Sequence, residues 1–210
     1  KQVTLQFEEF RITEEQAVEV QESKVVIRDM RLQPFGYAQG ESSSLVWAEG
    51  TDKAVGVSRL ELKQADEFFI YTTPASPIDL RKALEIVKPK TVYVFGIPPA
   101  EEKPEEFLAH LAGLCKFVLN QRSGNTSVPE LAAAMAVRES AIQTGLHWLA
   151  ASGELTIGID EDSVSLFAQK QEKNPYLQAE LFISLRGVIN EMSAYRKYFA
   201  TASDLSRLFN

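Results

Sequence analysis

The sequence predicts an α/β fold, in which a small, mostly parallel, Rossmann-like sandwich is followed by a winged helix-turn-helix and a long C-terminal helix. Three observations predict it. Short apolar runs alternate with amphipathic stretches in residues 23–121, the order helix, turn, helix, hairpin fills residues 126–168, and an apolar seam recurs at helical spacing after residue 175.

The expected domain boundaries follow these changes of pattern. Residues 3–10, VTLQFEEF, alternate apolar and polar side chains as a half-buried strand does. We expect residues 1–22 to be the terminal strand of a truncated, OB-like upstream domain plus a linker. The α/β domain is expected at 23–121, the winged-helix module at 122–170 and the C-terminal helices at 171–210.

Four short apolar runs predict the strands of a sheet, at residues 25–29, 45–49, 68–73 and 91–97. The last two runs are nearly continuous, which is typical of parallel strands that are covered on both faces. We therefore expect about four parallel strands, and the pattern leaves their order open.

A helix is predicted between the last two runs. Ser76 can cap its first turn, Pro77 suits that turn, and Asp79 lies near the positive end of the helix. Its buried side is expected to hold Ile78, Leu80, Ala83, Leu84 and Val87.

A second helix is expected over residues 103–121, with Cys115 as a buried structural thiol in its apolar run. Ser127 and Glu130 have the spacing of a capping box, which marks the start of the next helix. The helix expected at 138–152 buries Ile142, Leu146 and Leu149. Its opposite face is expected to show Arg138, Gln143, Thr144 and His147.

The charges of the winged-helix segment disfavour DNA. Arg138 is the only Lys or Arg in residues 126–168, and Asp160, Glu161 and Asp162 lie at the expected tip of the hairpin. Because Lys and Arg supply the affinity for a phosphate backbone, we expect this wing to repel DNA and the module to contact a protein.

The C-terminal seam predicts one helix of about 25 residues that begins after Asn174 and Pro175. The seam could pack across the rest of the fold, which we favour, or bind a partner helix. Its members, at spacings of three and four, are Leu177, Leu181, Leu185, Val188, Met192, Tyr195 and Phe199.

Catalytic motifs are missing from the sequence. The chain has two histidines and one cysteine, and neither a phosphate-binding glycine loop nor a nucleophile elbow follows a predicted strand. Asp29 and Arg31 end a predicted strand and could line a ligand site, although an ion pair at the rim of the sheet is the simpler interpretation. Tyr71, Thr72 and Thr73 end a neighbouring strand and are interpreted with the same caution.

Composition limits the class of protein. The 210 residues carry a net charge of -7, with a pI near 5.0, and 45% of them are hydrophobic, which favours a packed core and protein partners over a nucleic-acid coat. Neither an apolar leader nor a membrane span is apparent, so we expect a cytoplasmic protein without membrane contact.

Four stretches, taken in order, resemble the C-terminal part of a RecJ-type single-strand-specific DNA exonuclease of the DHH phosphoesterase superfamily. They are VTLQFEEFR at 3–11, VVIRDMR at 25–31, the pair FFIYTTP and TVYVFGIPPA, and a helix-turn-helix before SAYRKYFATASDLSRLF. Gly96 stands where the family's turn carries an acid. The resemblance implies a parent enzyme that degrades single strands from the 5′ end with Mn²⁺ or Mg²⁺, and a fragment without the catalytic Asp-His-His.

The sequence leaves three hypotheses for function. The first is a non-catalytic accessory region of that exonuclease, without a cofactor of its own, which docks partner proteins of the repair machinery or orients a weakly bound single strand. The second is a stand-alone winged-helix regulator with a ligand-sensing α/β domain. The third is an enzyme with an unrecognised site at Asp29 and Arg31.

Overall fold

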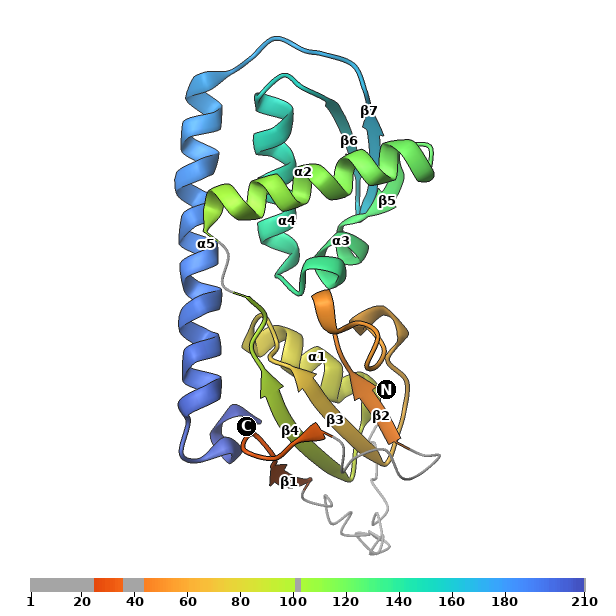
Figure 1. The fold of residues 1–210 in the computed structure, drawn as a ribbon, viewed down its shortest axis with the longest axis vertical. Helices are drawn as coiled ribbons and strands as arrows, with labels where there is room; N and C mark the ends of the chain where they lie inside the picture. Colours follow the sequence, from red (N-terminus) through yellow and green to blue (C-terminus); the bar gives the residue numbers. More distant parts are fainter. Residues whose placement is uncertain (1–24, 36–43, 101–102, 210) are drawn as a thin grey trace, which may run out of the picture.

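The computed structural model describes residues 25–35, 44–100 and 103–209, so the strand expected at 3–10 lies outside the described residues. The chain forms an α/β protein with a four-stranded parallel sheet, a small antiparallel sheet and a long C-terminal helix. Figure 1 shows two modules, one at each end of the molecule, and the long helix running beside both. We call them the α/β module and the helical module.

The α/β module confirms the predicted four parallel strands and supplies their order. The order is β1-β4-β3-β2, and every neighbouring pair is parallel, as in Rossmann-like sheets. The strands are β1 (Val26–Asp29), β2 (Ser44–Trp47), β3 (Glu67–Thr72) and β4 (Thr91–Ile97). Short 3₁₀ turns at Gly50–Asp52 and Arg59–Glu61 connect β2 to β3.

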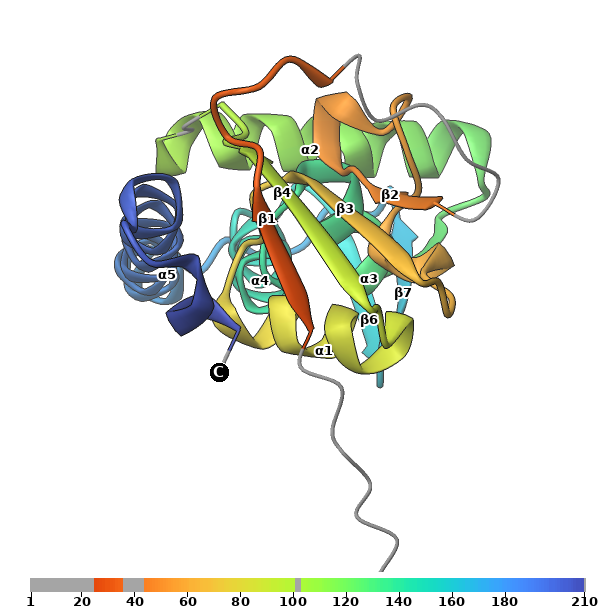
Figure 2. The same ribbon diagram turned by 90° about the horizontal axis from the view of Figure 1, so that it is seen from below.

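Helix α1 (Pro77–Val87) covers one face of the sheet, and the segment that follows β1 crosses the other face (Figure 2). Ser76 caps α1 as predicted, because its Oγ accepts a hydrogen bond of 3.1 Å from the backbone N–H of Asp79. The prediction that Ile78 is buried was wrong: this side chain is 59% exposed, since its position on the first turn faces away from the sheet.

The helical module begins with α2 (Pro104–Gln121) and continues through two further helices and three strands. The strands form an antiparallel sheet in the order β5-β7-β6. The remaining elements are β5 (Asn125–Ser127), α3 (Val128–Met135), α4 (Glu139–Ala151), β6 (Thr156–Asp160) and β7 (Ser163–Phe167).

Helix α2 packs with the helical module, whereas the sequence analysis placed it in the α/β domain that ended at residue 121. Phe107, Leu111 and Cys115 lie in one core with Leu146 of α4. The crossing is close: a Cβ added at Gly145 would come within 2.6 Å of a methyl carbon of Leu111. Amphipathicity shows that a helix has a buried face but does not show which module covers that face, and this explains the difference.

The local signals of the helical module are confirmed. Ser127 and Glu130 form the predicted capping box, with hydrogen bonds of 3.3 and 3.2 Å between each side chain and the other residue's backbone N–H. Gly153 has a φ of +77° directly after the last turn of α4, which glycine adopts without strain. Asp160, Glu161 and Asp162 are exposed at the tip of the β6–β7 hairpin, as expected.

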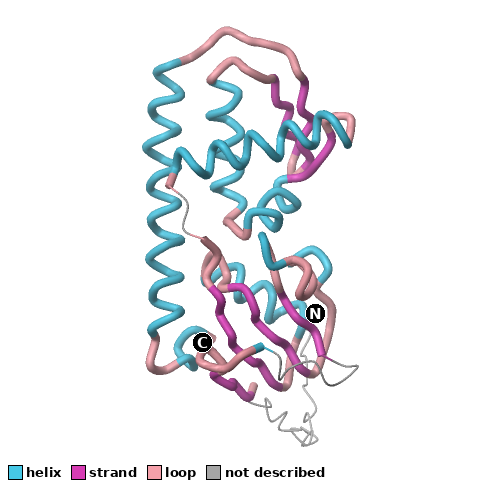
Figure 3. The backbone as a smooth tube through the Cα atoms, in the orientation of Figure 1, coloured by secondary structure: helices cyan, strands magenta, loops and turns pink. Residues whose placement is uncertain are grey.

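Helix α5 (Pro175–Thr201) joins the two cores. Leu185 and Met192 belong to the core of the helical module, and Phe199 belongs to the core of the α/β module. Leu177, predicted to belong to the buried seam, is 41% exposed because α5 extends beyond the packed region at its start. In Figure 3 this helix runs alongside both modules, and the helices of the helical module lie between it and the antiparallel sheet. None of the described helices is both long and apolar enough to cross a membrane.

Candidate functional site at the joint between the modules

The carboxyl ends of the parallel strands point toward the helical module (Figure 1). In open parallel sheets this edge is where ligands bind, because loops and helix N-termini converge there. Buried polar residues gather at this edge, among them Glu49 after β2, Thr72 at the end of β3 and Ser76 at the start of α1.

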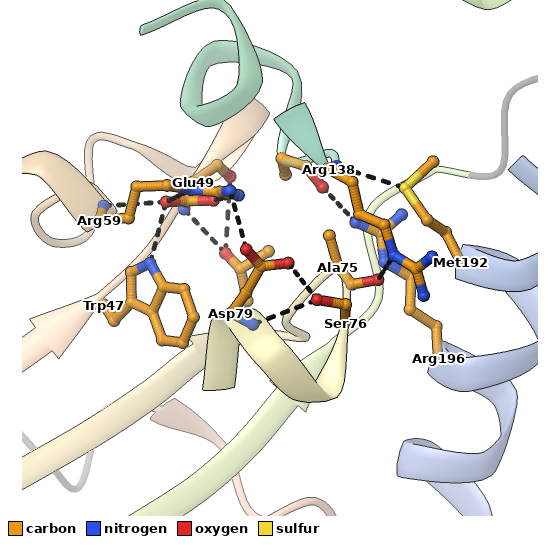
Figure 4. A network of polar contacts seen from close by, with 11 residues as sticks. Trp47, Glu49, Arg59, Ala75, Ser76, Asp79, Arg138, Met192 and Arg196 are labelled. Carbon is orange, nitrogen blue, oxygen red and sulfur yellow. Dashed lines mark hydrogen bonds and ion pairs between the residues drawn. The ribbon is translucent and has the colours of Figure 1, made fainter. Parts of the chain in front are cut away.

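Glu49 is the centre of a buried polar network (Figure 4). Its side chain is only 4% exposed, yet its carboxylate accepts four hydrogen bonds. Oε1 accepts from the indole N–H of Trp47 at 3.0 Å and from the backbone N–H and Nε of Arg59, both at 2.8 Å. Oε2 accepts from Nη2 of Arg59 at 2.5 Å. A buried carboxylate is tolerated only with such compensation.

Arg59 links this carboxylate to α1. Its Nη1 lies 3.4 Å from Oδ1 of Asp79, whose other oxygen accepts a hydrogen bond of 2.6 Å from Ser76. Burial alone would lower the pKa of Arg59, but the hydrogen bonds and negative charge of Glu49, with the charge of Asp79, outweigh it and raise the pKa. The guanidinium therefore stays charged and holds β2, its following turn and α1 together.

The α3–α4 turn of the helical module packs onto this edge. Arg138 points into the joint: its Nε donates to the carbonyl oxygen of Ala75 at 3.3 Å, and its Nη1 pairs with Glu191 at 2.9 Å. A Cβ added at Gly50 would lie 3.2 Å from the Cβ of Ala136. The prediction that Arg138 is on the exposed face of α4 was wrong, because this residue is the N-cap, where the chain turns toward the sheet.

Arg196 of α5 is the least compensated cation of the joint. Its Nη2 donates to the carbonyl oxygen of Ala136, whereas its Nε is buried without a hydrogen-bond partner. Burial, reinforced by the positive charge of Arg59, lowers its pKa to about 10. Among the described residues no carboxylate forms an ion pair with it. An unpaired buried donor costs about 1–3 kcal/mol.

Arg196 also lines a cleft of about 530 Å³ between the modules. The α/β module contributes the turn after β2 and the segment after β4, and the helical module contributes the start of α2 and the end of α3. Helix α5 forms the remaining wall. The volume lies in the range of small-molecule sites, and the lining combines apolar groups with a few charged ones.

Asp29 and Arg31 form an anchor on the edge of the sheet. Arg31 pairs with Asp29 through Nε at 2.9 Å and Nη2 at 2.7 Å, and it donates to the carbonyl oxygens of Phe199, Ala200 and Ala202. These carbonyls end α5. The simpler interpretation made from the sequence, an ion pair at the rim of the sheet, agrees with this geometry, since the guanidinium caps a helix C-terminus.

Part of the polar face of α4 is exposed to solvent. Gln143 and His147 are exposed, while Thr144 is half-buried and donates a hydrogen bond of 2.8 Å to the carbonyl oxygen of Ser140. Beside them the indole N–H of Trp148 is buried without a partner. The structure therefore leaves two of the four predicted residues of this face, Gln143 and His147, open to a partner.

The chain matches no family model, no curated protein and no solved structure in comparisons with known proteins. Among the described residues, no three His, Cys, Asp or Glu side chains are grouped so that they could hold a metal ion.

Sequence reasoning assigned none of the main residues of the joint, Glu49, Arg59, Asp79 and Arg196, to a site, and it placed Asp79 only in the first turn of a helix. Two features of the sequence indicate that Glu49 and Arg196 have unusual positions. Glu49 follows an apolar run that becomes β2, at the same carboxyl edge where Asp29 was considered. Arg196 lies four residues after Met192 and three before Phe199, so a charged side chain occupies the buried seam. Arg59 has no comparable signal, because it lies in an irregular connection.

Proposed function

We propose that the helical module is a winged helix-turn-helix. The support is its order of elements, α2, β5, α3, α4, β6, β7, together with the three-stranded antiparallel sheet. In such modules the second helix of the helix-turn-helix pair is the recognition element and the hairpin is the wing. Here these are α4 and the β6–β7 hairpin.

We infer that the chain is the non-catalytic C-terminal accessory region of a RecJ-type, 5′-to-3′ single-strand-specific DNA exonuclease. The observation that carries the proposal is the order of the resembling motifs along the fold. The motif at 3–11 lies outside the described residues. VVIRDMR spans β1 and the anchor residue Arg31, FFIYTTP and TVYVFGIPPA coincide with β3 and β4, and SAYRKYFATASDLSRLF spans the end of α5 and the 3₁₀ turn after it. The proposed role is partner docking or substrate orientation in DNA repair and recombination.

The charges of the module favour docking of a protein over binding of DNA. The exposed hairpin tip carries Asp160, Glu161 and Asp162, and Arg138 is engaged at the joint rather than on the recognition face. Gln143 and His147 offer polar donors and acceptors. Polar side chains of this kind suit a protein contact, whereas phosphate contacts need Lys and Arg.

A stand-alone winged-helix regulator of DNA is the second candidate. It requires a basic recognition helix, and the described exposed face of α4 contains no Lys or Arg. The third hypothesis, an enzyme with a site at Asp29 and Arg31, loses its support because both side chains are engaged in anchoring α5.

The proposal can be tested on the full-length protein encoded by the same reading frame. We expect upstream Asp-His-His motifs and metal-dependent hydrolysis of a 5′-labelled single strand. Removal of residues 25–210 should leave hydrolysis of a short oligonucleotide but abolish binding to partner proteins. If removal abolished hydrolysis itself, or if the purified chain degraded the strand alone with Mg²⁺ or Mn²⁺, the non-catalytic assignment would be wrong.

The contact face is tested by a triple substitution. Changing Gln143, Thr144 and His147 to Ala should leave folding nearly intact and weaken the binding of a protein partner more than the binding of a single strand. The matched control is a triple Ala substitution of the exposed residues Arg81, Lys82 and Glu85 on α1, which should change neither. If the triple variant instead lost more of its single-strand binding than of its partner binding at the same salt concentration, the module would be assigned to DNA recognition.

A further inference from the structure

Strand β6 forms one edge of the antiparallel sheet, whose strand order is β5-β7-β6. Leu166 of β7 shows which residues bond to which neighbour, because its backbone N–H donates at 2.8 Å to the carbonyl oxygen of Gly124, on the β5 side. Successive residues of an antiparallel strand direct their backbone groups to opposite sides. The residues of β7 that bond to β6 are therefore Ser163, Ser165 and Phe167.

The backbone groups of Ile157 and Ile159 consequently point away from β7. Both residues lie opposite β7 residues that bond toward β5, namely Leu166 and Val164. Within the part of the chain that the structure describes, no strand pairs with this side of β6. Gly158 between the two isoleucines is exposed, and since a glycine has no side chain, its exposed surface is backbone. The edge therefore offers N–H donors and C=O acceptors to a further strand.

The residues of β6 favour such pairing. Its sequence, TIGID, contains three β-branched residues and neither the lysine nor the proline that commonly blocks a sheet edge. Ile157 and Ile159 pack only partly against the core of the helical module, and the alternate residues Thr156, Gly158 and Asp160 lie on the opposite face. An added strand must therefore be apolar on one face and polar on the other.

We propose that the free edge of β6 binds the same edge of a second copy of the chain, in antiparallel orientation about Gly158. In this register Ile157 of each copy lies opposite Ile159 of the other, and each such pair exchanges backbone hydrogen bonds in both directions. Isoleucine meets isoleucine on one face, and Thr156 meets Asp160 on the other. The two small sheets become one continuous sheet.

The second copy suits this edge because β6 is complementary to itself. Ile-Gly-Ile is symmetric about Gly158, so every outward donor meets an outward acceptor, and the glycine leaves room at the symmetry axis. The acidic tips of the two hairpins lie at opposite ends of the paired strands, separated by about six residues of about 3.4 Å each, or roughly 20 Å. This exceeds the Debye length of about 8 Å at physiological salt, so the tips repel each other little.

Sedimentation equilibrium of the purified chain tests the proposal, which does not depend on the proposed exonuclease role. A short edge buries less than the roughly 800 Å² per partner of a standard interface, so we expect a dissociation constant of about 10⁻⁵–10⁻³ M. The average mass should rise with concentration from 23.4 kDa toward twice this value.

A charge at the symmetry axis should weaken this association. In Gly158→Lys the new Cβ meets its nearest neighbours, on Ser165, at an ordinary contact distance of 3.9 Å, so the fold should tolerate it. Two like charges then lie directly opposite each other in the dimer, and association should weaken by about tenfold or more. The matched control is Gly187→Lys, at an exposed glycine of α5 with open space around it, which should leave association unchanged.

A cross-link locates the axis. Gly158→Cys places two thiols on a pair that is not hydrogen-bonded, whose Cα atoms are about 4.5 Å apart, within reach of a disulfide. Oxidised glutathione should therefore convert this variant to a covalent dimer much faster than the control Gly187→Cys. The natural cysteine, Cys115, is buried and should give no dimer.

Three results would overturn the proposal. They are a mass that stays monomeric up to about 1 mM, equal effects of the two lysine substitutions, and equal rates of cross-linking in the two cysteine variants. Circular dichroism checks that each variant is folded. If Gly158→Lys did not fold, the comparison of the cysteine variants would decide alone.

Discussion

Nη1 of Arg31 donates a hydrogen bond of 2.8 Å to the carbonyl oxygen of Phe199, 168 residues later in the chain. The same guanidinium reaches the carbonyl oxygens of Ala200 and Ala202, so one side chain at the end of β1 caps the end of α5. Carbonyl groups at a helix C-terminus have no partner within the helix, and a cation there also meets the negative end of its dipole.

We expect Arg31→Met to lower the free energy of unfolding by about 1–3 kcal/mol, because the end of α5 loses its charged donors. Urea denaturation of the purified chain measures this. Arg81→Met on the exposed face of α1 is the control and should change it by less than about 0.5 kcal/mol. Equal effects of the two substitutions would show that the cap contributes nothing specific.

The ion pair of Asp29 and Arg31 also makes the stability of the fold depend on pH. The side-chain hydrogen bond from Arg31, which outweighs the opposing effect of burial, lowers the pKa of Asp29 below its ordinary value of 3.8. Because the pKa of Asp29 is lower in the folded state than in the unfolded state, its charged form stabilises the fold at pH values above the pKa of the unfolded state. This contribution disappears as the pH falls through the pKa of the folded state. The stability advantage of the natural chain over Asp29→Asn should therefore be constant above about pH 5 and shrink at lower pH. An advantage that grew on acidification would contradict the assignment.

Breaking the buried ion pair of Glu49 and Arg59 should lower the free energy of unfolding more than Arg31→Met does. Arg59→Met leaves the carboxylate of Glu49 buried without its main partner, and removal of one member of a buried pair costs about 3–5 kcal/mol. The double variant Arg59→Met with Glu49→Gln should lose clearly less than the sum of the two single variants, because no uncompensated charge remains. Additive losses in denaturant unfolding would mean that the two side chains act independently.

Helix α5 is predicted to be structural in its middle turns. Leu185 is fully buried, so Leu185→Ala should cost about 2–5 kcal/mol. Ile183, two residues earlier and 62% exposed, is the matched control, and Ile183→Ala should cost less than about 0.5 kcal/mol. A small loss at Leu185 would favour the alternative made from the sequence, a seam that binds a partner helix.

Periodicity and caps were sufficient to predict most of the helices and strands, although β5 and the 3₁₀ turns after β2 were not predicted. β4 has the predicted bounds, Ser76 and Asn174 cap their helices, and the alternation of strand and helix gave a parallel sheet. These features depend on local sequence, because a strand repeats every two residues and a helix every 3.6. The order β1-β4-β3-β2 was not predictable in the same way, because it depends on contacts between distant segments.

Most of the candidate site could not be predicted from the sequence, because the joint is assembled from segments that lie far apart in the chain. Arg138 was assigned to an exposed face from its place at the start of α4, and only the packing of the α3–α4 turn on the sheet shows why it points inward. Asp29 and Arg31 were found because they are close in sequence. Glu49 and Arg196 are 147 positions apart, and no periodic pattern connects them.

The acidic hairpin predicts how the chain responds to a change of charge. With Asp160, Glu161 and Asp162 exposed at the tip, binding of a single strand should be weak, with a dissociation constant no tighter than about 10⁻⁶ M at physiological salt. Replacing all three by Lys should raise the affinity for a fluorescent single strand and steepen its salt dependence, because each new cation can displace a counterion from a phosphate. The matched control replaces three exposed carboxylates on other segments, Asp66, Glu85 and Glu180, by Lys, which adds the same amount of positive charge outside the hairpin. A gain only in the hairpin variant would place the strand against the wing. Equal gains would reflect net charge alone, and no gain in either variant would mean that neither surface faces the strand.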